Sequence, residues 1–133
     1  MAIATHINPE TMLSNPAFTQ VVRVPAGTDI IYIGGQNGLD GNGQLAGPDL
    51  GAQARQALAN LQTCLAAAGA AIENVVKWTI LVVDGHDVRT GFAAFQQVWG
   101  QRPNPPAITV AKVAGLAIPG ALVEIDAVAA VPA

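Results

Sequence analysis

The chain has 133 residues, of which 51% are hydrophobic and only 11% charged, and six basic against nine acidic residues give a net charge of −3. This length predicts a single domain over residues 1–133. Basic residues that are few and unclustered predict no nucleic-acid partner. No apolar run approaches the roughly 18 residues that span a bilayer, and residues 1–10 lack a signal-peptide pattern. We therefore expect a cytoplasmic protein with no membrane association.

Metal and cofactor chemistry is also not expected. The single cysteine, Cys64, cannot form an internal disulfide, and it shows no zinc-ligand spacing with His6 or His86. We expect Cys64 to be a packed small residue rather than a nucleophile. The glycine-rich stretch 34–43 predicts a loop, but it lacks the spacing of a phosphate-binding loop. The sequence therefore predicts no metal site and no cofactor.

The first third of the chain predicts strands without a helix. Residues 1–19 contain Asn-Pro pairs and no clear period, which predicts an extended lead-in. Residues 20–24 and 30–33 are rich in β-branched side chains and are separated by a Pro/Gly turn. This pattern predicts a β-hairpin.

Two amphipathic helices are predicted in the rest of the chain. The first begins after Asp49, ends before Gly69 and carries apolar residues at helical spacing: Leu50, Ala54, Leu58, Leu61, Leu65 and Ala68. The second is capped by Asp87 and stopped by Gly100, and its apolar stripe consists of Val88, Phe92, Phe95 and Trp99. Strands are predicted at 75–83, 107–116 and 122–128. The expected order is therefore β-β-α-β-α-β-β, with both helices on one side of a sheet.

The last strand alternates in character and leaves one face of the sheet without cover. Val123 and Ile125 point to one side, whereas Glu124 and Asp126 point to the other. If the helices cover the first side, the second stays open. Because the strands are apolar on both faces and the chain carries little charge, we expect the open face to be buried in a closed ring of identical subunits. Glu124 would then lie in or beside a subunit interface.

Several short segments stand in a recognisable order and spacing: Ile31–Gln36, Ala52–Leu61, Ala67–Gly69, Val76–Thr79, Pro106–Ala107, Val113–Leu116 and Val123–Ile125. Together these segments resemble the RidA/YjgF/YER057c/UK114 family of reactive imine and enamine deaminases. The resemblance covers about residues 17–131. It implies an α+β, chorismate-mutase-like fold: a mixed sheet with two helices on one face. It also implies a barrel-like homotrimer with a pocket at each subunit interface.

The resemblance implies site residues as well, and it shows where this chain departs from the family. In the deaminating subgroup an arginine after the Pro-Ala pair holds the substrate carboxylate, and here that position is Ile108. The family glutamate that positions the attacking water corresponds to Glu124, which is retained. The position of a tyrosine that lines the family's pocket is occupied here by Phe18. The position of a small hydroxyl residue is occupied by Gly34.

These departures change the expected substrate. An isoleucine leaves a substrate carboxylate unpaired, and a charged hydrogen bond contributes about 1.5 to 3 kcal/mol. A neutral or aromatic substrate is therefore expected, rather than an imine derived from an amino acid. We expect Gln36 and the backbone around Gly34 and Thr109 to place it.

Two functions remain open at this point. The first is a small trimeric enzyme that hydrolyses or isomerises an enamine or imine, with Glu124 orienting water or transferring a proton. The alternative is a non-catalytic binding or structural trimer, in which Glu124 is a strut paired with a lysine. A ribonuclease activity, which is sometimes attributed to the family that the chain resembles, is a third and less favoured possibility, because an acidic net charge does not favour binding of RNA.

Overall fold

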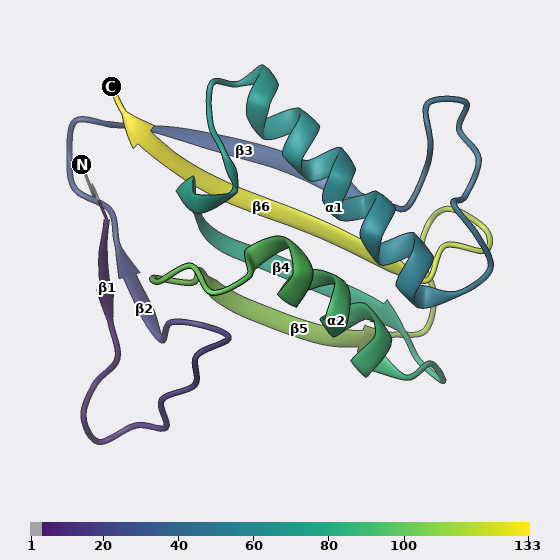
Figure 1. Cartoon of the computed structure of the whole chain (residues 1–133), viewed down its shortest axis with the longest axis horizontal. Helices are drawn as coiled ribbons and strands as arrows, with labels where there is room; N and C mark the ends of the chain where they lie inside the picture. The colour runs from purple at the N-terminus through teal and green to yellow at the C-terminus, as the bar shows by residue number, and fades with distance from the viewer. Residues whose placement is uncertain (1–3) are drawn as a thin grey trace.

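Two helices cover one face of a four-stranded sheet in the computed structural model of the chain, which describes residues 4–133 (Figure 1). The sheet has the strand order β3-β6-β4-β5. Its strands are β3 (Thr28–Gln36), β4 (Val75–Val83), β5 (Ala107–Val113) and β6 (Val123–Pro132). The helices are α1 (Leu50–Ala67) and α2 (Val88–Trp99), and a short 3-10 helix, η1 (Ile72–Asn74), precedes β4. Strand β6 is antiparallel to β3 and β4, whereas β4 and β5 are parallel. The predicted α+β fold with a mixed sheet is confirmed.

The predicted hairpin between residues 20–24 and 30–33 is wrong. Strand β2 (Val21–Arg23) pairs with β1 (Thr5–Ile7), a strand that the expected lead-in did not include, and β3 pairs with β6. The predicted loop at 34–43 also starts too early, because β3 continues to Gln36. Strand propensity marks extended segments but not their partners, and β6 offers β3 a much longer ladder than β2 could. The first three residues of the predicted lead-in lie outside the described residues.

Residues 4–24, which we call the N-terminal arm, lie beside one end of the main sheet (Figure 1). The arm is held at the start of β5 by Thr19, which is buried. The Thr19 backbone N donates to the Pro106 carbonyl at 3.1 Å, and its hydroxyl donates to the Pro105 carbonyl at 2.5 Å. These bonds bring the first quarter of the chain against its last quarter.

Helix α1 forms as the sequence predicts and packs over β6 and β3. The Asp49 side chain accepts a hydrogen bond from the Ala52 backbone N at 3.3 Å, and Gly69 follows the helix with φ of 79°. The side chains of Leu58, Leu61 and Leu65 are fully buried. Ala68, the last residue of the predicted stripe, is exposed, because the helix ends before it.

Helix α2 buries only half of its predicted stripe. Asp87 caps the helix and Gly100 ends it, as predicted. Phe95 and Trp99 are buried and meet the buried Trp78 edge to face, whereas Phe92 and Val88 are 45% and 37% exposed. The physical reason is position: α2 lies over the edge of the sheet, where β5 has no further strand beside it for the outer half of the stripe to pack on.

Strand β6 confirms the predicted two-faced character of the sheet. Val123, Ile125, Ala127 and Ala129 are buried under the helices, whereas Glu124 and Asp126 face the side without helices. On that open face Tyr32 is 79% exposed. The strand is longer than predicted, since it runs to Pro132, and β5 is shorter, since it ends at Val113. Among the described residues, no helix is both long and apolar enough to cross a membrane.

Candidate functional site

Glu124 lies on the open face of the sheet, in the middle of three strands. Its backbone is paired with Leu81 on β4, and β3 is the neighbour on the other side. The side chain is half-buried. No lysine, arginine or histidine of the described residues 4–133 lies within ion-pair distance of its carboxylate. Within one subunit the carboxylate therefore has no counter-ion among the described residues.

A glycine on β3 makes room for this carboxylate. The ladder between β3 and β6 shifts register between Ile33 and Gln36. A Cβ atom on Gly35 would lie 2.6 Å from Glu124 Oε2 and 2.8 Å from its Cδ, so only glycine accommodates the observed side chain. Our sequence prediction selected Gly34 instead, and a Cβ atom there would meet nothing within 4 Å. The available signal was the glycine pair inside an otherwise β-branched strand.

Gln36 adjoins this bulge but does not reach toward the carboxylate. Its Nε2 donates to the Gly34 carbonyl at 3.0 Å, and its backbone is paired with the buried Ile125. Two predicted substrate-placing residues, Gly34 and Gln36, therefore lie close to Glu124 on neighbouring strands.

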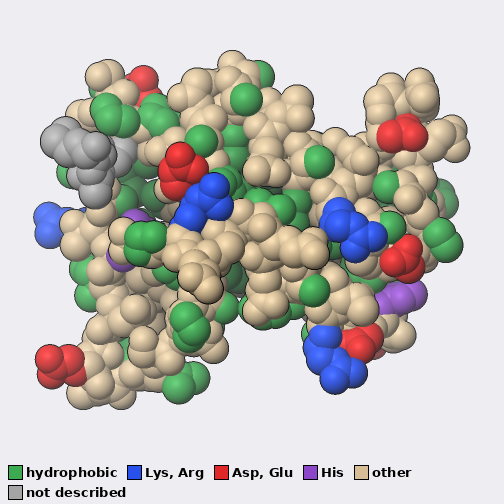
Figure 2. Space-filling model, in the orientation of Figure 1, with side chains coloured by type: hydrophobic (Ala, Val, Ile, Leu, Met, Phe, Trp, Pro, Cys, Tyr) green, Lys and Arg blue, Asp and Glu red, His purple; other side chains and the backbone are tan. Residues whose placement is uncertain are grey.

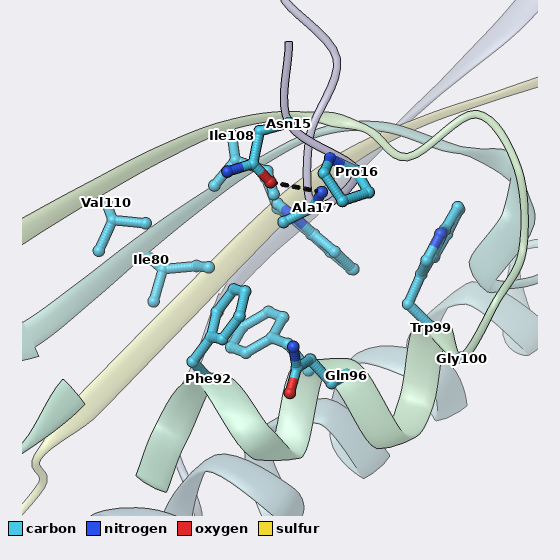
Figure 3. Close-up of a pocket in the computed structure, with 12 residues that line it drawn as sticks. Asn15, Pro16, Ala17, Ile80, Phe92, Gln96, Trp99, Gly100, Ile108 and Val110 are labelled. Carbon is cyan, nitrogen blue, oxygen red and sulfur yellow. Dashed lines mark hydrogen bonds between the residues drawn. The ribbon is translucent and has the colours of Figure 1, made fainter. Parts of the chain in front are cut away.

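Ile108 lies on the other face of the sheet. Its backbone is paired with Trp78, and its side chain lines a cavity of about 330 Å³ between β4, β5, α2 and the N-terminal arm. Figure 3 shows Ile108, Ile80 and Val110 along the strands, opposite Phe92 and Gln96 of α2, with residues 15–17 of the arm closing one end. We call this space the first cavity. Its walls contain no charged side chain, and Gln96 and Asn15 supply the polar side chains.

The remaining predicted residues, Phe18 and Thr109, do not line the first cavity. Phe18 is half-buried in the arm, next to Thr19 and the start of β5. Thr109 faces the open side, where its hydroxyl is hydrogen-bonded to Lys77 Nζ. Thr109 is two strand spacings across the sheet and two residues along the strand from Glu124, which corresponds to about 12 Å. Within one subunit the structure thus places Gly34 and Gln36 on the strand next to Glu124, whereas Ile108 lines the first cavity without Phe18 or Thr109.

Charged side chains are dispersed rather than gathered. On the helix side, Figure 2 shows Lys and Arg side chains in separate places, some of them beside an acidic neighbour. Arg89 forms an ion pair with Asp87 at 2.9 Å, and this pairing lowers the pKa of Asp87 and raises that of Arg89. Burial of His6 on β1 lowers the pKa of its imidazole. This face offers no continuous basic surface to a nucleic-acid backbone.

Comparison with known proteins identifies the family. Residues 10–131 match the Ribonuc_L-PSP family, described as endoribonuclease L-PSP. The chain belongs to this family, also known as the YjgF/RidA family. Human 2-iminobutanoate/2-iminopropanoate deaminase is 41% identical over 100 residues, which are 74% of this chain and 71% of the human protein. Mitochondrial protein mmf1 of Schizosaccharomyces pombe is 32% identical over 133 residues, covering 97% of this chain and 77% of mmf1.

Solved structures of the YjgF/RidA family agree with the fold. YyfB of Yersinia pestis, a Rid-family protein of unknown function, superposes with a TM-score of 0.87 at 34% identity and covers 98% of this chain and 100% of YyfB. The yjgF gene product of E. coli superposes with a TM-score of 0.69 at 31% identity, covering 80% of this chain and 83% of the E. coli chain. The predicted YjgF-like fold is confirmed.

Proposed function

We propose that this protein is an imine deaminase of the RidA type that hydrolyses or isomerises a reactive enamine or imine in a pocket between subunits, with Glu124 as the catalytic residue. Curated relatives at 38–41% identity are named 2-iminobutanoate/2-iminopropanoate deaminases. The observation that carries the proposal is the Glu124 carboxylate itself. It is half-buried on the open face, has no cation of the described chain beside it, and is accommodated by Gly35.

The pocket needs two copies of the chain. Glu124 and Ile108 lie on opposite faces of one sheet, so a single subunit cannot bring both to the same small molecule. In the proposed homotrimer, Glu124 of one subunit faces the first cavity of its neighbour. The open face, which includes the exposed Tyr32, would be buried in the same contact.

The reaction uses water and a single carboxylate. Glu124 accepts a proton from water as the water oxygen attacks the imine carbon, and then passes this proton to the imine nitrogen. The hydroxyl proton of the resulting carbinolamine moves through the same carboxylate to the nitrogen as the carbon–nitrogen bond breaks, which releases ammonia and leaves a carbonyl compound. Without attack by water, the same carboxylate would move a proton between carbon and nitrogen and so interconvert enamine and imine.

The substrate is proposed to be neutral or aromatic. No charged side chain lines the first cavity, and Ile108 occupies the position where the deaminating subgroup has a carboxylate-binding arginine. A carboxylate placed there would lose its water shell without gaining a partner, which costs more than a lost hydrogen bond. The side chains of Gln96 and Asn15 are the groups available to orient a neutral polar end.

A Glu124→Gln variant tests the proposal on a panel of neutral, aromatic and acidic imines. We expect a loss of turnover of about 100-fold or more on the neutral substrates, since a positioned general base contributes about 10²–10⁴-fold. Glu10→Gln, at an exposed glutamate of the arm, is the matched control and should retain full activity. Sedimentation velocity should give a trimer for both variants. Equal turnover by the wild type and Glu124→Gln on every substrate would refute the assignment.

The alternative, a binding or structural trimer without turnover, is favoured by the replacement of polar pocket groups by Phe18, Gly34 and Ile108. In one subunit Lys77 is hydrogen-bonded to Thr109 rather than to Glu124, so a lysine partner for Glu124 would have to come from another subunit. Tight ligand binding without turnover, with a trimer that dissociates in Glu124→Gln, would support this alternative.

A further inference from the structure

A second cavity continues from the first along α2. It also has a volume of about 330 Å³ and extends from Val110 and Phe92 toward Leu50 at the start of α1. The two cavities have four side chains in common: Ile80, Phe92, Phe95 and Val110. The two cavities are therefore adjacent, and these four shared side chains lie at the boundary between them.

The cavities exist because α2 does not pack closely on the strands beneath it. The aromatic rings of Trp78, Phe95 and Trp99 meet edge to face and fill the space between α2 and β4 at one place. On either side of this aromatic cluster the apolar walls are open to solvent, as the 45% exposure of Phe92 and the 57% exposure of Val110 show. Gaps of this size in so small a chain are typical of ligand sites, which measure about 300–1,000 Å³.

The second cavity is almost entirely apolar. Arg89 is the charged residue in its wall, and its guanidinium already forms three hydrogen bonds with the Asp87 carboxylate. Leu50, Val82, Val88 and Val123 supply aliphatic surface. This lining favours an uncharged hydrocarbon group and gives no support to a bound anion or a peptide backbone.

We propose that the two cavities form one channel that binds the hydrocarbon tail of a neutral substrate, with its polar end near Gln96 and Asn15. This inference rests on the proposed function for the identity of the reacting end. Phe92 and Val110, which lie in both cavities and are 45% and 57% exposed, then determine how long a tail is accepted. A small molecule fits the first cavity, because residues 15–17 of the arm, α2 and the sheet border it (Figure 3).

Ligand binding in the channel can be followed by tryptophan fluorescence. Trp78 and Trp99, the two tryptophans of the chain, both line the first cavity, so ligand binding should change the intrinsic fluorescence. The ligands are straight-chain primary amides of about four to ten carbons, which are neutral and stable. We expect the Kd to fall about fourfold for each added methylene until the channel is full, because a buried methylene contributes about 0.8 kcal/mol.

Val110→Phe and Val88→Trp should fill the second cavity from the strand and from the helix. Each should make the Kd level off at a shorter chain while leaving the shortest amides unaffected. Val21→Phe is the matched control, because Val21 is 45% exposed and lines neither cavity. A Kd independent of chain length, or the same length dependence in all three variants, would overturn the proposal.

Two further measurements separate this inference from competing explanations. If Val88→Trp, which changes the second cavity alone, alters the oligomer mass by sedimentation velocity and Val21→Phe does not, the second cavity is a contact between subunits and the channel proposal is wrong. Glu124→Gln should retain the chain-length dependence of binding. If the amides bind as expected but no imine is turned over, the proposed function fails and the channel stands.

Discussion

Replacing Gly35 by alanine should displace the Glu124 carboxylate without removing it. The added Cβ atom would lie 2.6 Å from Oε2, whereas an ordinary carbon–oxygen contact is about 3.3 Å or more. The carboxylate must therefore move by at least about 0.7 Å, and the next two atoms nearest the new methyl group, Cδ at 2.8 Å and Cγ at 3.0 Å, belong to the same Glu124 side chain. Because the obstacle is the end of a flexible side chain, Glu124 should rotate while the strand stays in place.

The free energies predict a small effect on stability and a large one on activity. An off-rotamer Glu124 costs about 0.5–1.5 kcal/mol, and replacing glycine stabilises the chain by about 0.4–1 kcal/mol through the unfolded state. These terms nearly cancel, so the Tm should change by less than about 4 °C. A catalytic group misplaced by about 1 Å can cost 100-fold in rate. We expect kcat to fall by about this factor.

The assay is imine hydrolysis, followed as release of ammonia, with thermal unfolding measured on the same preparations. Gly41→Ala is the matched control, because a Cβ atom at Gly41 meets nothing within 4 Å. If Gly35→Ala is folded and as active as Gly41→Ala, the position of the Glu124 carboxylate does not matter and our reasoning about the site is wrong. If Gly35→Ala loses activity only because it unfolds, the thermal data will show it.

Three further predictions follow from the structure. Ile108→Arg should raise turnover of acidic imines relative to neutral ones by about 10- to 100-fold in competition assays, since a charged hydrogen bond contributes about 1.5–3 kcal/mol; an unchanged ratio would argue against a pocket at Ile108. Burial lowers the pKa of the His6 imidazole below 6.5, so as the pH falls the imidazole is protonated in the unfolded chain before it is protonated in the folded one. The urea midpoint of unfolding should therefore decrease below about pH 6.5 in the wild type, and it should decrease less in His6→Gln. Gln53→Leu should lower the free energy of unfolding by about 2–4 kcal/mol in urea titrations. The buried Gln53 side chain donates to the Gly47 and Gly120 carbonyls and accepts from the Leu122 N–H, and leucine removes all three bonds. Gln56→Leu, at a half-buried site on the same helix, should lower the free energy of unfolding by less.

Local sequence patterns predicted the helices and the faces of the last strand well. Asp49 and Gly69 bound α1 because capping depends on residues within one turn of the helix. The alternation of Val123 and Glu124 gave the correct faces because side chains alternate along any strand. The same reasoning failed for the hairpin, since strand partners are chosen across the whole chain.

The sequence by itself therefore determined the two helices, the family, and the presence of a glutamate and an isoleucine at the two informative positions. The tertiary structure decided how these positions relate. Register on β4 places Glu124 on the open face and Ile108 on the helix side, and no local pattern records which strands become neighbours. Gly35 becomes informative for the same reason, because its contact with Glu124 joins residues about 90 positions apart in a ladder that only the folded sheet creates.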